Sequence, residues 1–518
     1  MAYLTEHTLA FVLLAAILWL PGYAIERSAA RGARLAAELR LPARFALGIG
    51  AWIVTLFVLA SLGLLSFTAL TLGAVLAAAA ALWARLRLAV EERPSEAQGR
   101  PAAIGLLAGG AIAAALLPLS FLAMSPTVSW DASAYHLTLP KLFVEAGRLQ
   151  TVELNVYSYW PLNVQLLYAM AMVFSDFVTA KLMHFGFGVL TLVTAFLGCK
   201  AFHRSASGWL ALPLLLANGV FAYEMRVAYV DLAYAFFFLA GFLFLFDATV
   251  SQRTPSQRTP SQRTPSQRTV SQRTVSQRTS ALWLAGVCCG LAAGTKINGI
   301  VGAAVLGLIF GASVLRSGSA SQITPRRFAI WFGLPVLLLW IPWIVRLAWT
   351  TGNPVYPFFY GTFGGPDWSE GLGEQFQAWQ SSIGMGRTPL DYLLLPLRVI
   401  LVGGVGYERF DGALAPYWLI LIPLALWAAR KIRFVRLCLA ASGLYFVTWA
   451  LSSQQMRFLI PILPLLAMAG GIAIVELFDR LPAVRWRRLA KGLTFAVAMI
   501  FFATSQARIL VAGTRTLG

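Results

Sequence analysis

The chain has 518 residues, of which 58% are hydrophobic and only 12% are charged, and its formal net charge is +20. A composition this apolar, with many runs close to the roughly 20 residues that cross a bilayer, excludes a soluble globular protein and indicates a polytopic membrane protein. The positive charge is compatible with nucleic-acid binding or with the topology of a membrane protein. The distribution of basic residues along the chain distinguishes these two interpretations.

We predict an all-α fold with about fourteen transmembrane helices, because apolar runs of near-spanning length follow one another along the whole chain. In chain order they cover residues 8–24, 46–66, 69–87, 102–123, 178–199, 208–222, 229–248, 281–294, 297–315, 328–349, 414–429, 434–451, 457–478 and 490–511.

The basic residues are distributed unevenly between the two predicted sides of the membrane. With the N-terminus outside, most of the 41 lysines and arginines fall in cytoplasmic segments, and the outer side is nearly neutral. This is the positive-inside pattern of membrane proteins, so the charge reports topology and the partner is the lipid bilayer, with no nucleic acid.

Two apolar segments, 162–174 and 392–405, are too short or too interrupted to span comfortably. If 162–174 crossed the bilayer, every later loop would change sides and the positive-inside pattern would be lost. Both are therefore predicted to be interfacial helices that lie on or dip into the outer face.

Residues 251–279 contain six copies of Ser-Gln-Arg-Thr separated by Pro or Val and have no apolar content to bury. This composition predicts a disordered cytoplasmic linker over 249–280. The expected organisation is additional N-terminal helices in 1–101, a core in 102–248 with a first outer loop at 124–177, the linker, and a second part in 281–518 with an outer loop at 350–413.

The first outer loop begins with Trp130-Asp131-Ala132-Ser133-Ala134-Tyr135-His136 and also contains Lys141, Asn155 and Trp160. The apolar spacing after Asp131 is helical, so this carboxylate has two interpretations. It could cap the N-terminus of a helix, a role worth about 0.5–2 kcal/mol. It could equally be a functional carboxylate in an aromatic outer loop.

Other charged residues occupy predicted outer turns. Arg226 and Asp231 flank one turn, Lys296 follows a short predicted span, and Arg457 begins a late span. An ion pair or side chains that reach toward the membrane surface would account for each of them separately. Charges near a bilayer interior are costly, however, and four of them on one side favour a functional site.

Several of these segments together resemble a known family. They are Trp130-Asp131-x-x-x-Tyr135-His136, Trp160-Pro161-Leu162, Ala228-Tyr229-Val230-Asp231, Gly294-Thr295-Lys296, Gly352-Asn353-Pro354-Val355-Tyr356-Pro357 and Gln455-x-Arg457-Phe458. In their order along the chain and their common side of the membrane, these motifs resemble those of the GT-C superfamily of polyprenyl-phosphate-sugar-dependent glycosyltransferases. The resemblance is greatest to bacterial members with the domain named for rhizobial lipopolysaccharide galacturonosyltransferases, which are related to the polyprenyl-phosphate-mannose protein mannosyltransferases.

The resemblance implies roles for individual residues. It implies that Asp131 is the catalytic or metal-linked carboxylate, that Asp231 is a second acidic residue near the site, and that Lys296, Arg226 and Arg457 bind the donor phosphate. The remaining candidates for substrate or donor binding are Tyr135, His136, Lys141, Asn155, Trp160 and Asn353. His136 could orient Asp131, bind sugar or ligate a metal ion.

The chain departs from the family pattern in two places. Protein O-mannosyltransferases carry adjacent Asp and Glu in the first outer loop, where this chain has Asp131-Ala132. The first outer loop also follows the fourth predicted span instead of the first. The first difference leaves the acceptor and a requirement for a divalent cation open.

The predicted function is an integral membrane glycosyltransferase of the cell (inner) membrane with its active site facing the periplasm. It would transfer a sugar from a polyprenyl-phosphate donor to a glycolipid, glycan or protein acceptor with inversion, with Asp131 as general base. The candidate cofactor is a divalent cation at Asp131 and His136. The alternatives are a transporter or flippase of lipid-linked glycans and a glycan ligase.

Overall fold

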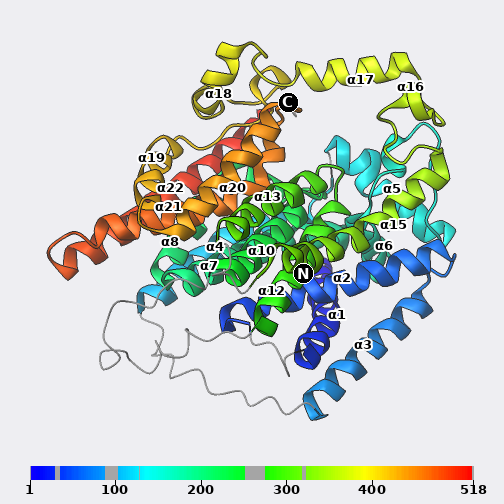
Figure 1. The fold of residues 1–518 in the computed structure, drawn as a ribbon, viewed down its shortest axis with the longest axis horizontal. Helices are drawn as coiled ribbons and strands as arrows, with labels where there is room; N and C mark the ends of the chain where they lie inside the picture. Colours follow the sequence, from blue (N-terminus) through cyan, green and yellow to red (C-terminus); the bar gives the residue numbers. More distant parts are fainter. Residues whose placement is uncertain are drawn as a thin grey trace.

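The structure is a computed structural model that describes residues 2–29, 35–87, 103–127, 129–250, 275–317 and 323–515. Within these ranges the chain forms helices and no β-strand, and an isolated β-bridge joins Gly404 to Gly412. Figure 1 shows the helices packed into one elongated bundle.

The first part of the bundle contains α1 (Ala2–Ala29), α2 (Arg40–Ser61), α3 (Phe67–Arg87), α4 (Ala103–Met124), α5 (Thr138–Ala146), α6 (Asn163–Phe174), α7 (Phe177–Phe202), α8 (Ser205–Leu216), α9 (Gly219–Glu224) and α10 (Asp231–Val250). The second part contains α12 (Val275–Ala293), α13 (Gly299–Ser317), α14 (Pro325–Phe328), α15 (Leu334–Thr351), α16 (Tyr360–Phe363), α17 (Glu370–Ser382), α18 (Pro389–Leu401), α19 (Trp418–Ala429), α20 (Arg433–Ala450), α21 (Leu463–Phe478) and α22 (Val484–Arg515). Shorter helical turns are η1 (Ala37–Leu39), η2 (Ala132–His136), η3 (Val156–Ser158), η6 (Ala329–Gly333), η7 (Tyr407–Arg409) and η8 (Met456–Ile462).

Nine helices among the described residues are long and apolar enough to cross a membrane. They are Ala2–Ser28, Ala37–Ser61, Phe67–Arg87, Gly105–Met124, Phe177–Phe202, Asp231–Thr249, Gly299–Arg316, Pro325–Thr351 and Met456–Phe478. The predicted all-α membrane fold is confirmed, but the predicted count of fourteen spans is not. The remaining predicted crossings coincide with α8, α12, α19, α20 and α22, which are shorter or more polar.

The two predicted interfacial segments form short helices in different surroundings. The first is α6, in which Asn163–Ala171 is buried throughout by packing against α2, α5 and α7. It is therefore enclosed by protein along most of its length. The second is α18, which exposes Leu393 and Leu397 and buries Leu395 and Val399, as an interfacial helix does.

α10 lies at the centre of the bundle and is buried along its whole spanning length. It packs against α7, α12, α13 and η8. A helix that is apolar on all sides needs this enclosure, because no face of it is suited to water. Its first residue, Asp231, is thus anchored by the most enclosed helix of the bundle.

Helices α1, α2 and α3 pack on one another, and α2 also contacts α6, α10 and α12. The additional N-terminal helices therefore support the central helices directly. Of the predicted linker 249–280, residues 251–274 lie outside the described residues. The described chain resumes at Val275 as α12, so the final repeat copy is part of a helix.

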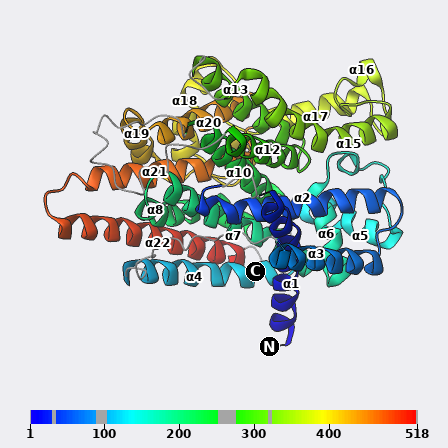
Figure 2. The same ribbon diagram turned by 60° about the horizontal axis from the view of Figure 1, so that its bottom comes forward.

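The two large predicted outer loops lie together at one end of the bundle. Tyr159 Oη donates to Asp367 Oδ2 at 3.0 Å and Trp160 Nε1 donates to Tyr356 O at 3.2 Å, so the two loops are in contact. Figures 1 and 2 both show α5, α6, α15, α16 and α17 on the right, away from the turn between α21 and α22 on the left. Segments far apart in the sequence therefore meet at one end of the membrane helices, where the candidate site lies.

Asn163 fixes the turn that carries Lys296. Its backbone N–H donates to Gly294 O at 3.0 Å, its Nδ2 donates to Leu291 O at 3.0 Å, and its Oδ1 accepts from Trp343 Nε1 at 2.8 Å. A Cβ atom at Gly294 would lie 2.3 Å from Asn163 Nδ2, so only glycine permits this approach. The end of α12 is thus held against the start of α6.

Candidate active site

Asp131 lies on a helical turn that continues into the π-helical turn η2. Its side chain makes no capping hydrogen bond to the turn that follows. Instead, Asp131 Oδ2 forms an ion pair with Arg457 Nη1, and both side chains are largely buried. The helix-cap interpretation is therefore excluded, and the carboxylate faces a cation from the far end of the sequence.

Arg457 is held on several sides. Its Nε donates to Gln455 Oε1 at 3.1 Å, and its guanidinium lies over the Tyr229 ring at 4.9 Å from the centroid. Gln455 Nε2 in turn donates to Asp411 Oδ2 at 3.1 Å, which ties Arg457 to the second outer loop. Because the guanidinium is planar, these contacts fix the direction in which it can bind an anion.

The second ion pair joins Lys296 Nζ to Asp231 Oδ1 at 2.8 Å. The Asp231 side chain is 2% exposed and that of Lys296 is 18% exposed. His184 supports this corner, since its Nε2 accepts from Leu232 N–H at 3.2 Å and its Nδ1 lies 2.7 Å from Val227 O. The start of α10 therefore has little freedom to move away from Lys296.

The two cations share one aromatic ring. Lys296 Nζ lies 3.9 Å and Arg457 Cζ 5.3 Å from the centroid of Phe458, so the two pairs are close neighbours. Each cation–π contact stabilises its charge, but the like charges repel one another. An anion between them would relieve that repulsion, which makes this corner suited to a phosphate group.

A row of aromatic rings runs from Arg457 to the outer loop. Tyr229 contacts His136 at 5.5 Å between centroids, His136 contacts Tyr135 at 4.1 Å, and Tyr135 stacks on Tyr157 at 4.0 Å and 9°. Tyr157 then meets Trp160 edge-on at 5.1 Å. These flat surfaces suit contact with the apolar faces of a sugar or with an isoprenoid chain.

His136 is buried and uncharged at neutral pH. Burial lowers the pKa of His136 well below its usual value of 6.5, and the nearby charges of Arg457 and Lys296 lower that pKa further. Its Nδ1 lies 2.9 Å from Gln165 Nε2. Among the described residues, no three His, Cys, Asp or Glu side chains are grouped so that they could hold a metal ion. In this arrangement Asp131 Oδ2 is paired with Arg457 Nη1.

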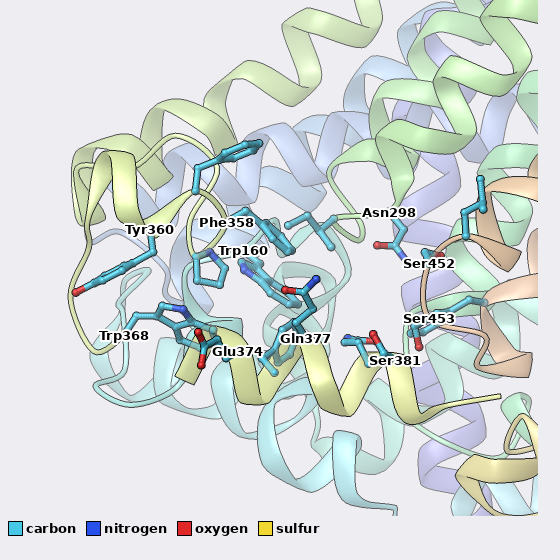
Figure 3. A pocket seen from close by; sticks show the side chains of 18 of the residues that line it. Trp160, Asn298, Phe358, Tyr360, Trp368, Glu374, Gln377, Ser381, Ser452 and Ser453 are labelled. Atoms are coloured by element: carbon cyan, nitrogen blue, oxygen red, sulfur yellow. The ribbon is translucent and has the colours of Figure 1, made fainter. Parts of the chain in front are cut away.

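A cavity of about 910 Å³ opens beside these ion pairs. Lys296 and Phe458 form part of its wall, and α17 and the loop before it form the opposite side. In Figure 3, Glu374, Gln377 and Ser381 project from α17 into the space faced by Asn298, Ser452 and Ser453, with Trp160 and Phe358 at the other side. The cavity thus combines two cations, Lys296 and Arg387, with aromatic rings, carboxylates and amides.

Comparison with known proteins identifies the segment that carries half of this site. Residues 156–353, which include Asp231, Lys296 and Asn353, match the family described as dolichyl-phosphate-mannose-protein mannosyltransferase. The matched segment is less than half of the chain. The match confirms the GT-C resemblance predicted from the sequence motifs, and with it the glycosyltransferase class.

The comparison with solved structures found two proteins with low sequence identity to this chain. ArnT from Cupriavidus metallidurans bound to undecaprenyl phosphate is 16% identical over 79% of this chain and 73% of its own, with a TM-score of 0.49. The archaeal oligosaccharyltransferase AglB from Archaeoglobus fulgidus, in complex with an inhibitory peptide and a dolichol-phosphate, is 14% identical over 77% of this chain and 55% of its own, with a TM-score of 0.41. No curated protein matches the sequence.

Two of the predicted residues, Lys141 and Arg226, do not take part in the two buried ion pairs. Lys141 is 70% exposed and pairs with Glu145 at 3.7 Å on the surface of α5. Arg226 is half-buried, with its guanidinium 5.2 Å from the Tyr223 ring centroid. Both remain candidates for donor binding only as predictions from the sequence.

Two predicted asparagines and Trp160 bind the backbone around the site. Asn353 is fully buried, and its Nδ2 donates to Phe358 O at 2.9 Å and Gly364 O at 3.2 Å, so it shapes the second outer loop. Asn155 Nδ2 donates to Ala134 O at 3.4 Å. Trp160 Nε1 donates to Tyr356 O at 3.2 Å while its ring lines the cavity.

Glu224 is a third carboxyl group that the sequence motifs did not single out. It ends α9 and is 1% exposed, and neither Oε atom has a hydrogen-bond partner among the described residues. Burial raises its pKa well above the usual 4.5, and the nearby Asp231 raises that pKa further. With Glu224 protonated and neutral, the charges of Asp131 and Asp231 balance those of Arg457 and Lys296. The sequence feature that could have identified Glu224 as a site residue is its position close to Arg226 and Asp231.

Replacing Glu224 with glutamine should weaken the pH dependence of stability. The folded protein keeps the Glu224 proton to a higher pH than the unfolded chain does. The free energy of unfolding of the wild type therefore falls as the pH rises from about 4.5 to the raised pKa of the folded state. For one group this fall is about 1.4 kcal/mol per pH unit. Glutamine removes that loss. Thermal unfolding in detergent across this range should show the Tm difference moving in the variant's favour as pH rises; parallel curves would contradict a raised pKa at Glu224.

Proposed function

We propose that this protein transfers a sugar from a polyprenyl-phosphate donor to a hydroxyl group of a glycolipid, glycan or protein. The observation that carries the proposal is the pair of cations, Lys296 and Arg457, which share the Phe458 ring at the wall of the cavity. The family of the matched domain is described by a dolichyl-phosphate-linked donor, which supports the same class of donor here.

In this mechanism the donor phosphate takes the place of Asp131 as the partner of Arg457, and it also contacts Lys296, which stays paired with Asp231. Arg457 then releases Asp131, which becomes free to accept a proton. Lys296 and Arg457 stabilise the negative charge that grows on the phosphate as it leaves, because they are fixed in place before the reaction. Asp231 holds Lys296 in position.

The bond changes of the transfer are those of a single displacement. The acceptor oxygen attacks the anomeric carbon while Asp131 removes its proton, and the bond from that carbon to the phosphate oxygen breaks. The electron pair leaves with the polyprenyl phosphate, and the configuration at the anomeric carbon inverts. The aromatic row from Tyr229 to Trp160 would hold the sugar or the first isoprene units.

We place this site on the outer, periplasmic face of the inner membrane. The distribution of basic residues supports this orientation, since the ends of α13 and α20 farthest from the cavity carry Arg316, Arg433 and Arg436. The donor would then reach the cavity from the outer leaflet.

Mass spectrometry of membrane glycolipids and surface glycans tests the proposal. A strain without the gene should lack one sugar unit, and the wild-type gene should restore it while a gene encoding Asp131→Asn, expressed at the same level, should not. A difference of a whole oligosaccharide would instead indicate a glycan ligase. Restoration by Asp131→Asn would point to a transporter, and unchanged glycans in the deletion strain would contradict transfer.

A further inference from the structure

A second cavity of about 560 Å³ lies between α13 and α20, at the opposite end of these helices from the candidate active site. Lys296 precedes the first residue of α13, whereas Arg316 lies in its last turn. At 1.5 Å per residue, the 19 residues of α13 separate the two ends by about 28 Å. This cavity therefore belongs to the other side of the membrane domain.

Three guanidinium groups from two helices line this cavity: those of Arg316, Arg433 and Arg436. Arg433 Nη2 donates to Ser313 Oγ at 2.7 Å, and Arg436 Nε donates to Ala429 O at 3.1 Å, so two of the three are oriented. None of the described residues that line the cavity is acidic. Guanidinium groups bind phosphate through paired hydrogen bonds, and their convergence here creates a site for an anion.

Apart from Ser313, the rest of the wall is apolar. It consists of Leu308, Ile309, Ala312, Leu437, Ala440 and Leu444, and Leu308 is 66% exposed in the isolated chain. On a helix that crosses the bilayer, such an exposed leucine faces hydrocarbon. An occupant of this cavity therefore meets cations at one end and an acyl-chain environment at the other.

The start of α20 adds to the preference for an anion. No side chain caps its first turn, and that turn contains no acidic residue but two arginines. Cations at a helix N-terminus are unfavourable because the helix dipole is positive there, and a bound anion would offset this cost. Topology alone needs arginines on this side, but it does not require them to converge on one cavity.

We propose that this cavity binds an anionic phospholipid, with the phosphodiester between the three arginines and the first part of an acyl chain along Leu308 and Leu437. A free phosphate would use the cations but leave the apolar wall empty. Basic cavities between transmembrane helices bind lipid headgroups in this way. The site is separate from sugar transfer and does not depend on the proposed donor.

Native mass spectrometry of the full-length protein, purified in detergent and supplied with phosphatidylglycerol or phosphatidylcholine, tests this proposal. We expect the wild type to retain phosphatidylglycerol about tenfold more than phosphatidylcholine, as one or two charge-assisted hydrogen bonds would allow. The R316Q/R436Q variant should lose this preference. Ala440→Trp, which fills the cavity without changing charge, should lose it as well.

The R485Q/R488Q variant is the matched control, because it removes the same charge from two exposed arginines of α22 that do not line the cavity. It should retain the wild-type preference. Equal retention of the two lipids by the wild type, or an undiminished preference in R316Q/R436Q, would overturn the proposal. Displacement of phosphatidylglycerol by millimolar inorganic phosphate would show that the cavity binds small anions without preference for a lipid, and it would also overturn the proposal.

Discussion

Replacing Asp131 with asparagine should lower sugar transfer by about 10²–10⁴-fold, the contribution of a general base, while the protein remains folded in the membrane. Asparagine keeps the size of the side chain and can still accept a hydrogen bond from Arg457, but it cannot take a proton from the acceptor. Transfer from a polyprenyl-phosphate sugar, measured with purified protein in vesicles, should show the loss mainly in kcat.

The Asp131 experiment needs controls for buried charge. Removing one partner of a buried pair leaves Arg457 uncompensated, and that can cost several kcal/mol of stability. The double variant D131N/R457Q removes both charges, so recovery of stability without recovery of activity would separate the two effects. Glu145→Gln removes an exposed carboxylate on α5 and should have no effect on transfer. Near-normal transfer by a folded Asp131→Asn protein would rule out its role as the base.

Replacing Lys296 with glutamine should lower kcat/KM by about 10²–10³-fold, as the loss of one fixed group that stabilises developing charge typically does. Lys296 is the cation of the two that lines the cavity, and burial lowers its pKa while the paired Asp231 acts in the opposite direction. Lys296→Arg keeps the charge and should retain part of the activity, although its planar group changes the geometry.

Two further variants decide between a catalytic and a structural role for Lys296. Lys141→Gln removes an exposed lysine of the first outer loop and should leave transfer unchanged, because its ammonium group pairs with Glu145 on the surface of α5. K296Q/D231N removes the whole buried pair; it should be more stable than Lys296→Gln alone yet remain inactive. Recovery of transfer in that double variant would show that Lys296 only compensates Asp231.

The membrane helices were predictable because the bilayer imposes a local requirement on sequence. A helix such as α4 or α13 must supply an apolar run of fixed length, and that run can be read without knowing what it packs against. Short helices are harder to place. α6 is apolar and too short to span the bilayer, which predicted an interfacial position. In the structure, its apolar residues are buried against α2, α5 and α7.

The aromatic and charged motifs were found from sequence because charges are rare in this chain and cluster in a few turns. Their partners could not be found in that way. Asp131 and Arg457 are separated by most of the chain, and several side chains could have paired with either. Lys141 and Arg226 have the same chemistry as Lys296 and Arg457, and only the packed positions separate the two groups.

By itself, the sequence determined that this is a helical membrane protein with polar chemistry gathered toward one side, because hydropathy and charge act residue by residue. It also indicated the glycosyltransferase class through short motifs. Only the tertiary structure decided that Asp131 pairs with Arg457, that Lys296 pairs with Asp231, and that both cations meet at Phe458. Such pairings depend on which helix ends are brought together, and burial then makes each pairing strong because water no longer competes for the charges.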